Sequence, residues 1–474
     1  DQAGTLPPPT AAVDRTVIGA AALDDFFGAP ATDREGLGDP AGVKHDAIGS
    51  VVLGHFDAPY FLTNGPDHLG RIEHDDAGQA TVQATAQIPY FLALPRDSGS
   101  GLANIPVLIF QHGLNASRGQ VAAVANDYAR AGYATIGVDA LWHGERRPGH
   151  VDAIHNFSGA AGADGLADDD PFGASLLFFD FNGDDSVGVD SLDARVARDN
   201  FRQAVLELTE LVRLLVQGNT TAIAASDPSL ATLTLDASHV IYTSESFGSI
   251  LGAITLAVDP RLSSAILSVG GAGIFLPTFA DSPYFAKLAS IFFKPSLDSA
   301  LDVSDPATLP AEAQRSLGLM QAVIEPGDPV AFAPLIARRP ARFAKSLVLL
   351  QAFSDELIPN QAGEFLAAQA GATTLTIPNH TQPVRYVTTL PTAAAPLSGN
   401  LNGVTVAHVN VDPATHLMFT RFHDQRIYQP GFPPLTPLPA PQDIDEPIEW
   451  LHALAIAFAD SERANQGPPV VTAP

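Results

Sequence analysis

The sequence predicts an α/β protein with a mostly parallel, doubly wound sheet, and three observations support that class. Residues 104–113 (N-I-P-V-L-I-F-Q-H-G) form a short continuous apolar run, which is typical of a strand buried on both faces. A helical pattern over residues 120–131 separates this run from a second strand-like segment at 134–139. An amphipathic helix predicted over residues 199–217 then leads into another strand. Such alternation favours parallel strands joined by right-handed helical crossovers.

Strand-like segments continue on both sides of this unit. Residues 48–62 and 80–94 both contain P-Y-F-L near their ends, and the turn-forming stretch T-N-G-P-D-H-L-G lies between them, so we expect two neighbouring antiparallel strands. Residues before Asp46 show no steady periodicity, and we interpret them as a surface arm. Further strands are predicted directly before Ser246 and at residues 264–270, 346–353 and 403–411, with a closing helix at 451–459.

Two segments interrupt the alternation and divide the chain. Residues 149–192 are rich in Gly and Asp and are expected to form a loop over the sheet. Residues 274–342 contain an amphipathic stretch, several prolines and a helical pattern at 311–324, which predicts a helical cap over the carboxyl ends of the strands. A helical packing layer is the alternative for this insertion. The expected parts are an N-terminal arm (1–47), a first part of the core (48–273) with the acidic loop, a cap or lid insertion (274–342), a second part of the core (343–460) and a C-terminal tail (461–474).

Composition and charge argue against several classes of function. A net charge of −27 disfavours binding to DNA, RNA or anionic membranes, so no nucleic-acid partner is expected. The sequence has no cysteine, so we expect no disulfide, no thiolate metal ligand, no cysteine nucleophile and no lipid-anchored N-terminal cysteine. The apolar run at 265–279 is broken by glycines and a proline, so no integral membrane segment is expected. The chain opens with D-Q-A-G-T-L-P-P-P-T, a start typical of a processed N-terminus, and we expect export to the extracellular space or periplasm of a bacterium.

The stretch from His239 to Ile250 (H-V-I-Y-T-S-E-S-F-G-S-I) points to chemistry. A β-branched and aromatic run stops at small residues and a helical pattern follows, which predicts a strand, a sharp turn and a helix with Ser246 at the apex. A tight turn lifts a serine hydroxyl clear of its own backbone, where a histidine can activate it. Gly248 supplies the small residue after the apex, whereas Ser244 replaces the first glycine of G-x-S-x-G. An ordinary strand-to-helix connection with serines as helix caps is the alternative.

Partners for such a serine follow in the order Ser, Asp, His. The strand S-L-V-L-L-Q-A-F ends in S-D-E-L-I-P, which puts Asp355 where a carboxylate can orient a histidine. His416 follows the strand V-T-V-A-H-V-N-V and is placed to act as general base and then general acid. Upstream, Q-H-G-L-N ends a strand where a first oxyanion loop belongs. The backbone N–H groups of Leu114 and Phe247 are therefore the expected oxyanion-hole donors.

Taken together, the motifs F-Q-H-G-L, S-E-S-F-G, S-D-E-L-I-P and A-T-H-L-M-F resemble those of the α/β-hydrolase superfamily, serine esterase and lipase type, over about residues 48–460. The helix R-D-N-F-R-Q is similar to a segment of large bacterial exported lipases and lysophospholipases. The resemblance implies an α/β-hydrolase fold and a serine carboxylic ester hydrolase that works through a Ser-His-Asp triad and an acyl-enzyme. It implies no cofactor, and a small-molecule or polymeric ester as the substrate, with polyesters included.

The predicted substrate preference is for hydrophobic esters, because the expected cap is rich in aromatic residues. Two other functions stay open at this point. One is a peptidase or amidase on the same fold, and the other is a non-catalytic binding protein that has kept the fold. The aromatic residues of the expected cap are Phe275, Phe279, Tyr284, Phe285, Phe292 and Phe293.

Several residues compete for the catalytic roles. Ser244 and Ser249 lack a small residue at the required spacing on both sides, and Glu356 is expected to point away from the histidine that Asp355 orients. His408 lies within the last strand and is expected to be buried and structural. The remaining candidates are His380 and His423, which stay alternatives as loop histidines, and His112 and His143, which are expected to shape loops.

Two short segments carry residue types that bind metals. Asp180, Asn182 and Asp184 stand at alternate positions of D-F-N-G-D-D-S-V-G-V-D and form a calcium-loop candidate. The segment lacks the glycine at the sixth position and the carboxylate at the twelfth, which favours a solvated acidic loop. The second group consists of His150, Asp152 and His155. We predict no metal site from either segment.

Overall fold

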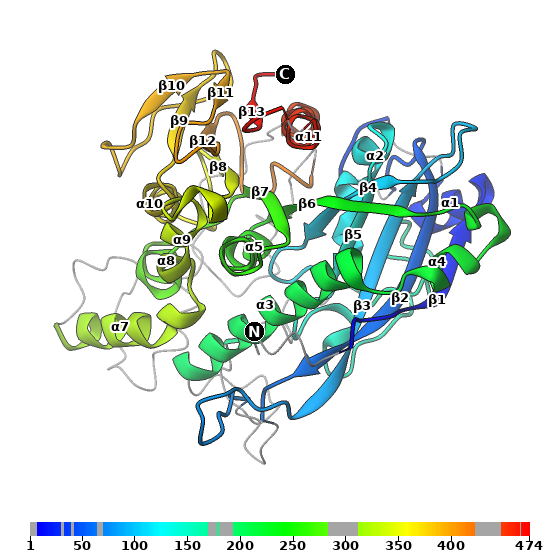
Figure 1. Cartoon of the computed structure of the whole chain (residues 1–474), viewed down its shortest axis with the longest axis horizontal. Helices are drawn as coiled ribbons and strands as arrows, with labels where there is room; N and C mark the ends of the chain where they lie inside the picture. The colour runs from blue at the N-terminus through cyan, green and yellow to red at the C-terminus, as the bar shows by residue number, and fades with distance from the viewer. Residues whose placement is uncertain are drawn as a thin grey trace.

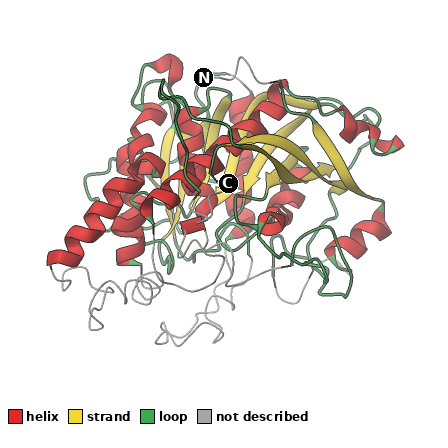
Figure 2. Cartoon of the chain, turned by 90° about the horizontal axis from the view of Figure 1, so that it is seen from below, coloured by secondary structure: helices red, strands yellow, loops and turns green. Residues whose placement is uncertain are grey.

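A mixed sheet with helices on both faces forms the centre of the molecule (Figures 1 and 2). The computed structural model describes residues 7–29, 33–38, 42–63, 70–168, 178–179, 193–282, 311–421, 447–464 and 466–474. Within these ranges the main sheet has 11 strands in the order β1-β2-β3-β5-β4-β6-β7-β8-β12-β9-β10, and a second sheet pairs β11 with β13. The predicted α/β class with a mostly parallel sheet is confirmed.

The strands split into an antiparallel and a parallel part. The pairs β1–β2, β2–β3 and β3–β5 are antiparallel, and every later pair of the main sheet is parallel. The strands are β1 (Ala11–Ile18), β2 (Ile48–Tyr60), β3 (Ala84–Pro95), β4 (Ile105–Gln111), β5 (Ala134–Val138), β6 (Leu235–Glu245), β7 (Leu262–Ser268), β8 (Ser346–Ala352), β9 (Thr373–Thr376), β10 (Thr392–Ala394), β11 (Leu397–Ser398), β12 (Val406–Val411) and β13 (Val470–Val471).

Helices cover the two faces of the sheet and enclose two hydrophobic cores. One core lies under α3, α5, α8, α9 and α10, and the other lies under α1, α2 and α11. The helices are α1 (Ala20–Phe27), α2 (Ala122–Arg130), α3 (Ala194–Gln217), α4 (Thr221–Ala225), α5 (Phe247–Val258), α7 (Ala311–Ile324), α8 (Pro329–Phe332), α9 (Pro334–Ala337), α10 (Asn360–Ala370) and α11 (Ile448–Arg463). Short 3-10 or π turns lie between them, among them η6 (Ile274–Phe279).

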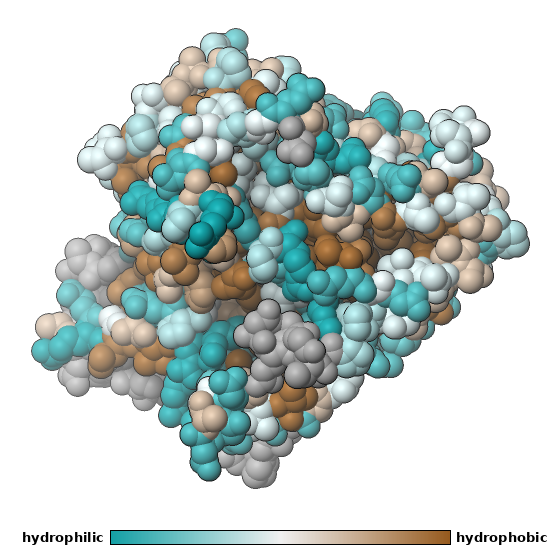
Figure 3. Space-filling view, in the orientation of Figure 1, coloured by the Kyte–Doolittle hydropathy of each residue, from teal (hydrophilic) through white to brown (hydrophobic). Residues whose placement is uncertain are grey.

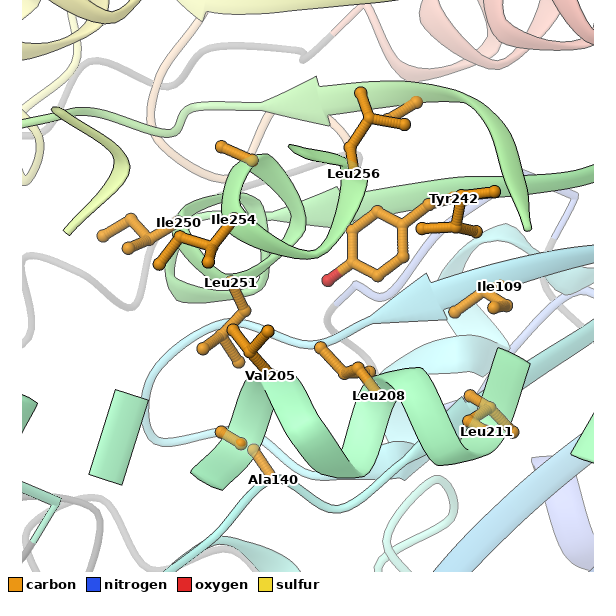
Figure 4. Packing of buried hydrophobic residues seen from close by; sticks show 14 of the residues in the cluster. Ile109, Ala140, Val205, Leu208, Leu211, Tyr242, Ile250, Leu251, Ile254 and Leu256 are labelled. Carbon is orange, nitrogen blue, oxygen red and sulfur yellow. The ribbon is translucent and has the colours of Figure 1, made fainter. Parts of the chain in front are cut away.

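Strand β4 is apolar over most of its length because its residues pack into both cores. Along β4, Val107 and Ile109 belong to the core under α3 and α5, whereas Leu108 and Phe110 belong to the core on the opposite face. Side chains alternate between the faces of a strand, so a strand covered twice needs apolar residues at every position. Figure 4 shows the first core, in which the apolar face of α3 packs against α5 and the strand that precedes it.

The N-terminal region differs from the expected surface arm. Residues Ala11–Ile18 form the edge strand β1, which pairs antiparallel with β2, and α1 follows it directly. The register shifts between Val13 and Arg15, so a bulge interrupts the two-residue alternation that reveals a strand in a sequence. At the other end of the chain, β13 pairs with β11, so the C-terminal tail is partly held in a sheet.

The insertion at residues 274–342 is described only in part. Of its elements, α8 and α9 pack against α5, and α7 packs along α3 and η6. Residues 283–310, which include Tyr284, Phe285, Phe292 and Phe293, lie outside the described residues. The assignment of this insertion as a cap stays a prediction.

One face of the molecule mixes polar and apolar residues. In the space-filling view hydrophilic residues cover much of the visible face, and apolar residues form patches between them (Figure 3). Across the described part of the chain, no helix has both the length and the apolar character that crossing a bilayer requires.

Candidate active site

The predicted turn at Ser246 is present between β6 and α5. Strand β6 ends at Glu245 and α5 begins at Phe247, so Ser246 is the single residue between them. Its backbone has φ 55° and ψ −118°, a conformation that costs energy for a residue with a side chain. The Ser246 N–H donates to Ser268 O at 2.8 Å, which ties the turn to β7. This strand–turn–helix geometry is that of a nucleophile elbow.

Small side chains around the turn have a steric reason. A Cβ atom on Gly248 would lie 2.3 Å from the carbonyl oxygen of Gln111 in β4, so glycine is required there. Ser244 fits in place of the other glycine because its hydroxyl is 2.9 Å from that of Ser249. The Ser249 hydroxyl in turn donates to Ser268 O at 2.6 Å. Both rival serines are therefore buried inside the turn and hydrogen-bonded there.

Three predicted side chains from distant segments meet beside this turn. His416 Nε2 lies 2.7 Å from Ser246 Oγ, and His416 Nδ1 lies 2.9 and 3.0 Å from the two carboxylate oxygens of Asp355. Asp355 follows β8 and also accepts the backbone N–H groups of Leu357 and Ile358, which fixes its carboxylate. The side chains of His416 and Asp355 are only 2% and 1% exposed. The arrangement allows His416 to take the proton of Ser246 while Asp355 holds the ring.

Three carboxyl groups control the charge of His416. Burial alone would lower the pKa of this histidine, but the charge and hydrogen bond of Asp355, with the charges of Glu356 and Glu245, raise it to about 9. Glu356 accepts the backbone N–H of His416 at 3.2 Å, so it faces the histidine backbone and does not point away as expected. Burial, with the charge of Asp355, raises the pKa of Glu356 to about 8.

Glu245 is a site residue that the sequence reasoning missed. It is fully buried, and its Oε2 accepts hydrogen bonds from Gln120 Nε2 at 2.8 Å and from the Thr420 hydroxyl at 2.6 Å. Burial raises the pKa of Glu245 to about 7. The sequence does contain a sign of its importance: Glu245 is an acidic residue at the end of an otherwise uncharged stretch of strand, directly before the turn.

The expected oxyanion loop lies against Ser246. A Cβ atom on Gly113 would lie 3.4 Å from Ser246 Cβ. The Gly113 carbonyl accepts the His112 Nδ1–H at 2.8 Å, and in a trans peptide the next N–H, that of Leu114, points the opposite way. Among the described residues, the N–H groups of Leu114 and Phe247 have no hydrogen-bond partner. Both remain the predicted donors to an oxyanion.

The other histidine candidates are occupied elsewhere. His112 Nε2 accepts the Ala140 N–H at 3.0 Å, and the His143 ring stacks on Phe247 with centroids 5.1 Å apart, so both shape the loops around the site. His408 is buried in β12, where burial lowers its pKa to about 4. His380 stacks on Trp450. His423 lies outside the described residues.

The structure gives no metal site among the residues it describes. No group of three or more His, Asp or Glu side chains there is arranged to hold an ion. Asp152 instead accepts the backbone N–H groups of Asp164 and Gly165, at 2.9 Å each. The calcium-loop candidate with Asp180, Asn182 and Asp184 lies outside the described residues.

Comparisons with known proteins give matches only among solved structures. No protein-family profile matches the chain, and no curated protein matches it. A fungal esterase from Rhizomucor miehei is 14% identical, with 87% of this chain and 84% of that chain covered and a TM-score of 0.36. Acetyl xylan esterase 1 from Thermoanaerobacterium sp. JW/SL YS485 is 11% identical, with 84% and 86% covered and a TM-score of 0.35. Acylaminoacyl peptidase from Pyrococcus horikoshii is 12% identical with a TM-score of 0.33, and 73% of this chain spans 37% of the peptidase.

Proposed function

Starting from the α/β-hydrolase fold of the chain, we propose that it is a serine carboxylic ester hydrolase with Ser246 as the nucleophile. The observation that carries the proposal is the continuous hydrogen-bonded series Asp355–His416–Ser246. A serine hydroxyl is a weak nucleophile unless a base takes its proton as it attacks. His416 Nε2 is within hydrogen-bond reach of that proton.

The proposed reaction has two halves. Ser246 Oγ attacks the ester carbonyl while its proton moves to His416 Nε2, and the developing oxyanion accepts the N–H groups of Leu114 and Phe247. His416 then returns the proton to the leaving alcohol, which leaves an acyl group on Ser246. Water attacks this acyl-enzyme with His416 again as the base, and the acid and the free serine are released.

The proposed preference for hydrophobic esters rests on the aromatic residues expected in the cap. Beside the turn lies a largely buried aromatic cluster. It consists of Phe178, Phe179, Phe201, Phe247 and Phe279, in which the rings of Phe178 and Phe247 lie 4.8 Å apart and those of Phe179 and Phe279 lie 5.2 Å apart. Phe247 is the first residue of α5, so this apolar group adjoins an expected oxyanion donor. We include lipids and polyesters within the proposed substrate class.

Fluorophosphonate labelling tests the proposal directly. Wild-type protein should form one covalent adduct that maps to Ser246, and Ser246→Ala should form none, because only an activated serine attacks the phosphorus. Absence of an adduct on the wild-type chain would favour a non-catalytic binding protein. Nitrophenyl esters of graded acyl length and the matching anilides then separate the classes. Anilide turnover equal to ester turnover would point to an amidase, and turnover of acetate alone would contradict the hydrophobic preference.

A further inference from the structure

Gln120 links three segments of the candidate active site that are distant in sequence. Its side-chain oxygen accepts the Gly113 N–H at 2.9 Å. Its Nε2 donates to Glu245 Oε2 at 2.8 Å and to the Thr420 hydroxyl at 3.3 Å. Gly113 belongs to the expected oxyanion loop, Glu245 directly precedes the candidate nucleophile, and Thr420 lies on the loop that carries the candidate base. One amide therefore contacts all three segments.

The chemistry of these partners fixes the orientation of the amide. A backbone N–H can only donate, so the Gly113 N–H requires the oxygen of Gln120. The Thr420 hydroxyl uses its own proton on Glu245 Oε2 at 2.6 Å and is thereby an acceptor for Gln120. A reversed amide would place N–H against N–H at Gly113 and oxygen against a carboxyl oxygen at Glu245. The observed orientation gives the Gly113 N–H, the Thr420 hydroxyl oxygen and Glu245 Oε2 a complementary partner.

Both polar backbone groups of Gly113 are held by side chains. Its N–H is bound by Gln120, and its carbonyl is bound by the ring of His112. A glycine held at one group only can rotate its peptide planes at little cost, because it has no Cβ. With both groups held, the plane that carries the Leu114 N–H cannot turn freely.

We propose that Gln120 is a positioning residue that holds the oxyanion loop in register with the nucleophile turn and the histidine loop. The inference rests on the proposed function, since it concerns the transition state of that reaction. Gln120 itself touches none of the reacting atoms. It acts through Gly113 on the direction of the Leu114 N–H.

The ionisation of Glu245 makes the hydrogen bonds of Gln120 depend on pH. The charged and titratable groups that face it are His416 and Arg421, and burial raises its pKa to about 7. Ionisation strengthens the hydrogen bonds that Gln120 and Thr420 donate to it, because charge-assisted bonds are the stronger kind. The same charge, with those of Asp355 and Glu356, favours the protonated form of His416.

The test replaces Gln120 with leucine, and Gln203 with leucine as a matched control. Gln203 is a buried amide with the same pattern: its oxygen accepts the Phe61 N–H at 2.9 Å, and its Nε2 donates to Pro59 O at 3.1 Å and to Glu207 Oε1 at 3.0 Å. None of these partners belongs to the candidate active site. Both variants lose three hydrogen bonds, so a general loss of stability affects both.

We expect Gln120→Leu to lower kcat for a nitrophenyl ester by about 100-fold, with KM changed by less than about threefold, because a displaced donor is felt mainly in the transition state. The affinity for a trifluoromethyl ketone, whose adduct with serine carries an oxyanion, should fall by the same factor as kcat/KM. Gln203→Leu should lower the melting temperature without changing kcat or the ketone affinity. Glu245→Gln keeps an oxygen for both donors and removes the charge, so the pH of half-maximal kcat/KM should fall.

The outcomes separate this inference from the proposed function. A wild-type chain that gives no fluorophosphonate adduct on Ser246 overturns the proposed function. A wild type that turns over ester, with Gln120→Leu retaining full kcat and ketone affinity, overturns the positioning role alone. Equal losses of activity in the Gln120 and Gln203 variants, in proportion to their melting temperatures, would also overturn it. If the pH profile of kcat/KM is the same in Glu245→Gln as in the wild type, the proposed role of Glu245 in the pH dependence is overturned.

Discussion

Replacing Asp355 with asparagine should change both the pH dependence of protein stability and the rate of turnover, because the charge of Asp355 acts on His416. In the wild-type chain the carboxylate of Asp355 overcomes the effect of burial and is the main cause that raises the pKa of His416 to about 9. Asparagine has nearly the same size but no charge. The pKa of His416 should therefore fall in the variant, since burial then acts with less opposition.

The magnitude follows from the linkage between proton binding and folding. A histidine whose pKa rises from 6.5 to about 9 on folding contributes about 3 kcal/mol to the free energy of unfolding when it is protonated. This contribution is fully present below pH 6.5 and is lost as the pH rises through 9, because above that pH neither state holds the proton. In Asp355→Asn most of this pH-dependent part should disappear. Turnover should fall by about 10⁴-fold, because the amide no longer fixes the productive tautomer.

Urea unfolding of both proteins between roughly pH 6 and pH 9.5 measures the first effect, and kcat/KM for a nitrophenyl ester over the same range measures the second. Asp14→Asn is the matched control, because Asp14 makes the same kind of contact, 3.0 Å from the Nδ1 of His55, between exposed side chains on β1 and β2. It should leave both curves unchanged. If the unfolding free energies of wild type and Asp355→Asn run parallel across the range and turnover is retained, the reasoning is refuted.

Three further substitutions follow from the same geometry. Gly248→Ala places a Cβ 2.3 Å from Gln111 O and should lower stability by about 1–3 kcal/mol and abolish most of the turnover. Thermal unfolding and an ester assay measure the two effects, and normal activity would contradict the steric argument. Ser244→Gly restores the usual glycine, so turnover should stay within about threefold while about 1 kcal/mol of stability is lost with the hydroxyl, and a large gain in activity would contradict this. Lys345→Met removes a buried ammonium that donates to Leu256 O at the end of α5. Because burial lowers the pKa of Lys345 to about 8, the stability of the wild type relative to the variant should rise from pH 8 to 10.5. A stability difference that stays constant over this range in urea unfolding would count against the prediction.

The sequence predicts those parts of the site whose local structure is determined by a short motif. The alternation of strands and helices predicts the parallel sheet. Ser246, Asp355 and His416 each follow a predicted strand, and the carboxyl ends of parallel strands share one edge of a sheet. Their order therefore predicts that they meet, and the structure brings them into contact.

The parts that the sequence does not predict depend on contacts between distant segments. Gln120 and Glu245 are 125 residues apart, and no local pattern pairs them. Adjacent side chains are expected to point in opposite directions, which would turn Glu356 away from His416. Its direction depends instead on the loop that carries His416, whose backbone N–H donates to Glu356. Strand β1 is hidden because its bulge and its place at the edge of the sheet weaken the alternation of polar and apolar residues.

The position of β6 in the sheet has a consequence for partial unfolding. In the described sheet β6 is the sixth of 11 strands, with five on each side. Backbone amides there should be among the slowest to exchange with deuterium, whereas those of the outermost strands β1 and β10 should exchange early. His416 and Asp355 follow β12 and β8, which lie nearer to the β10 edge. Fraying from that side would withdraw the base while the serine stays in its turn, so heating should switch the reaction off reversibly before the centre of the sheet gives way.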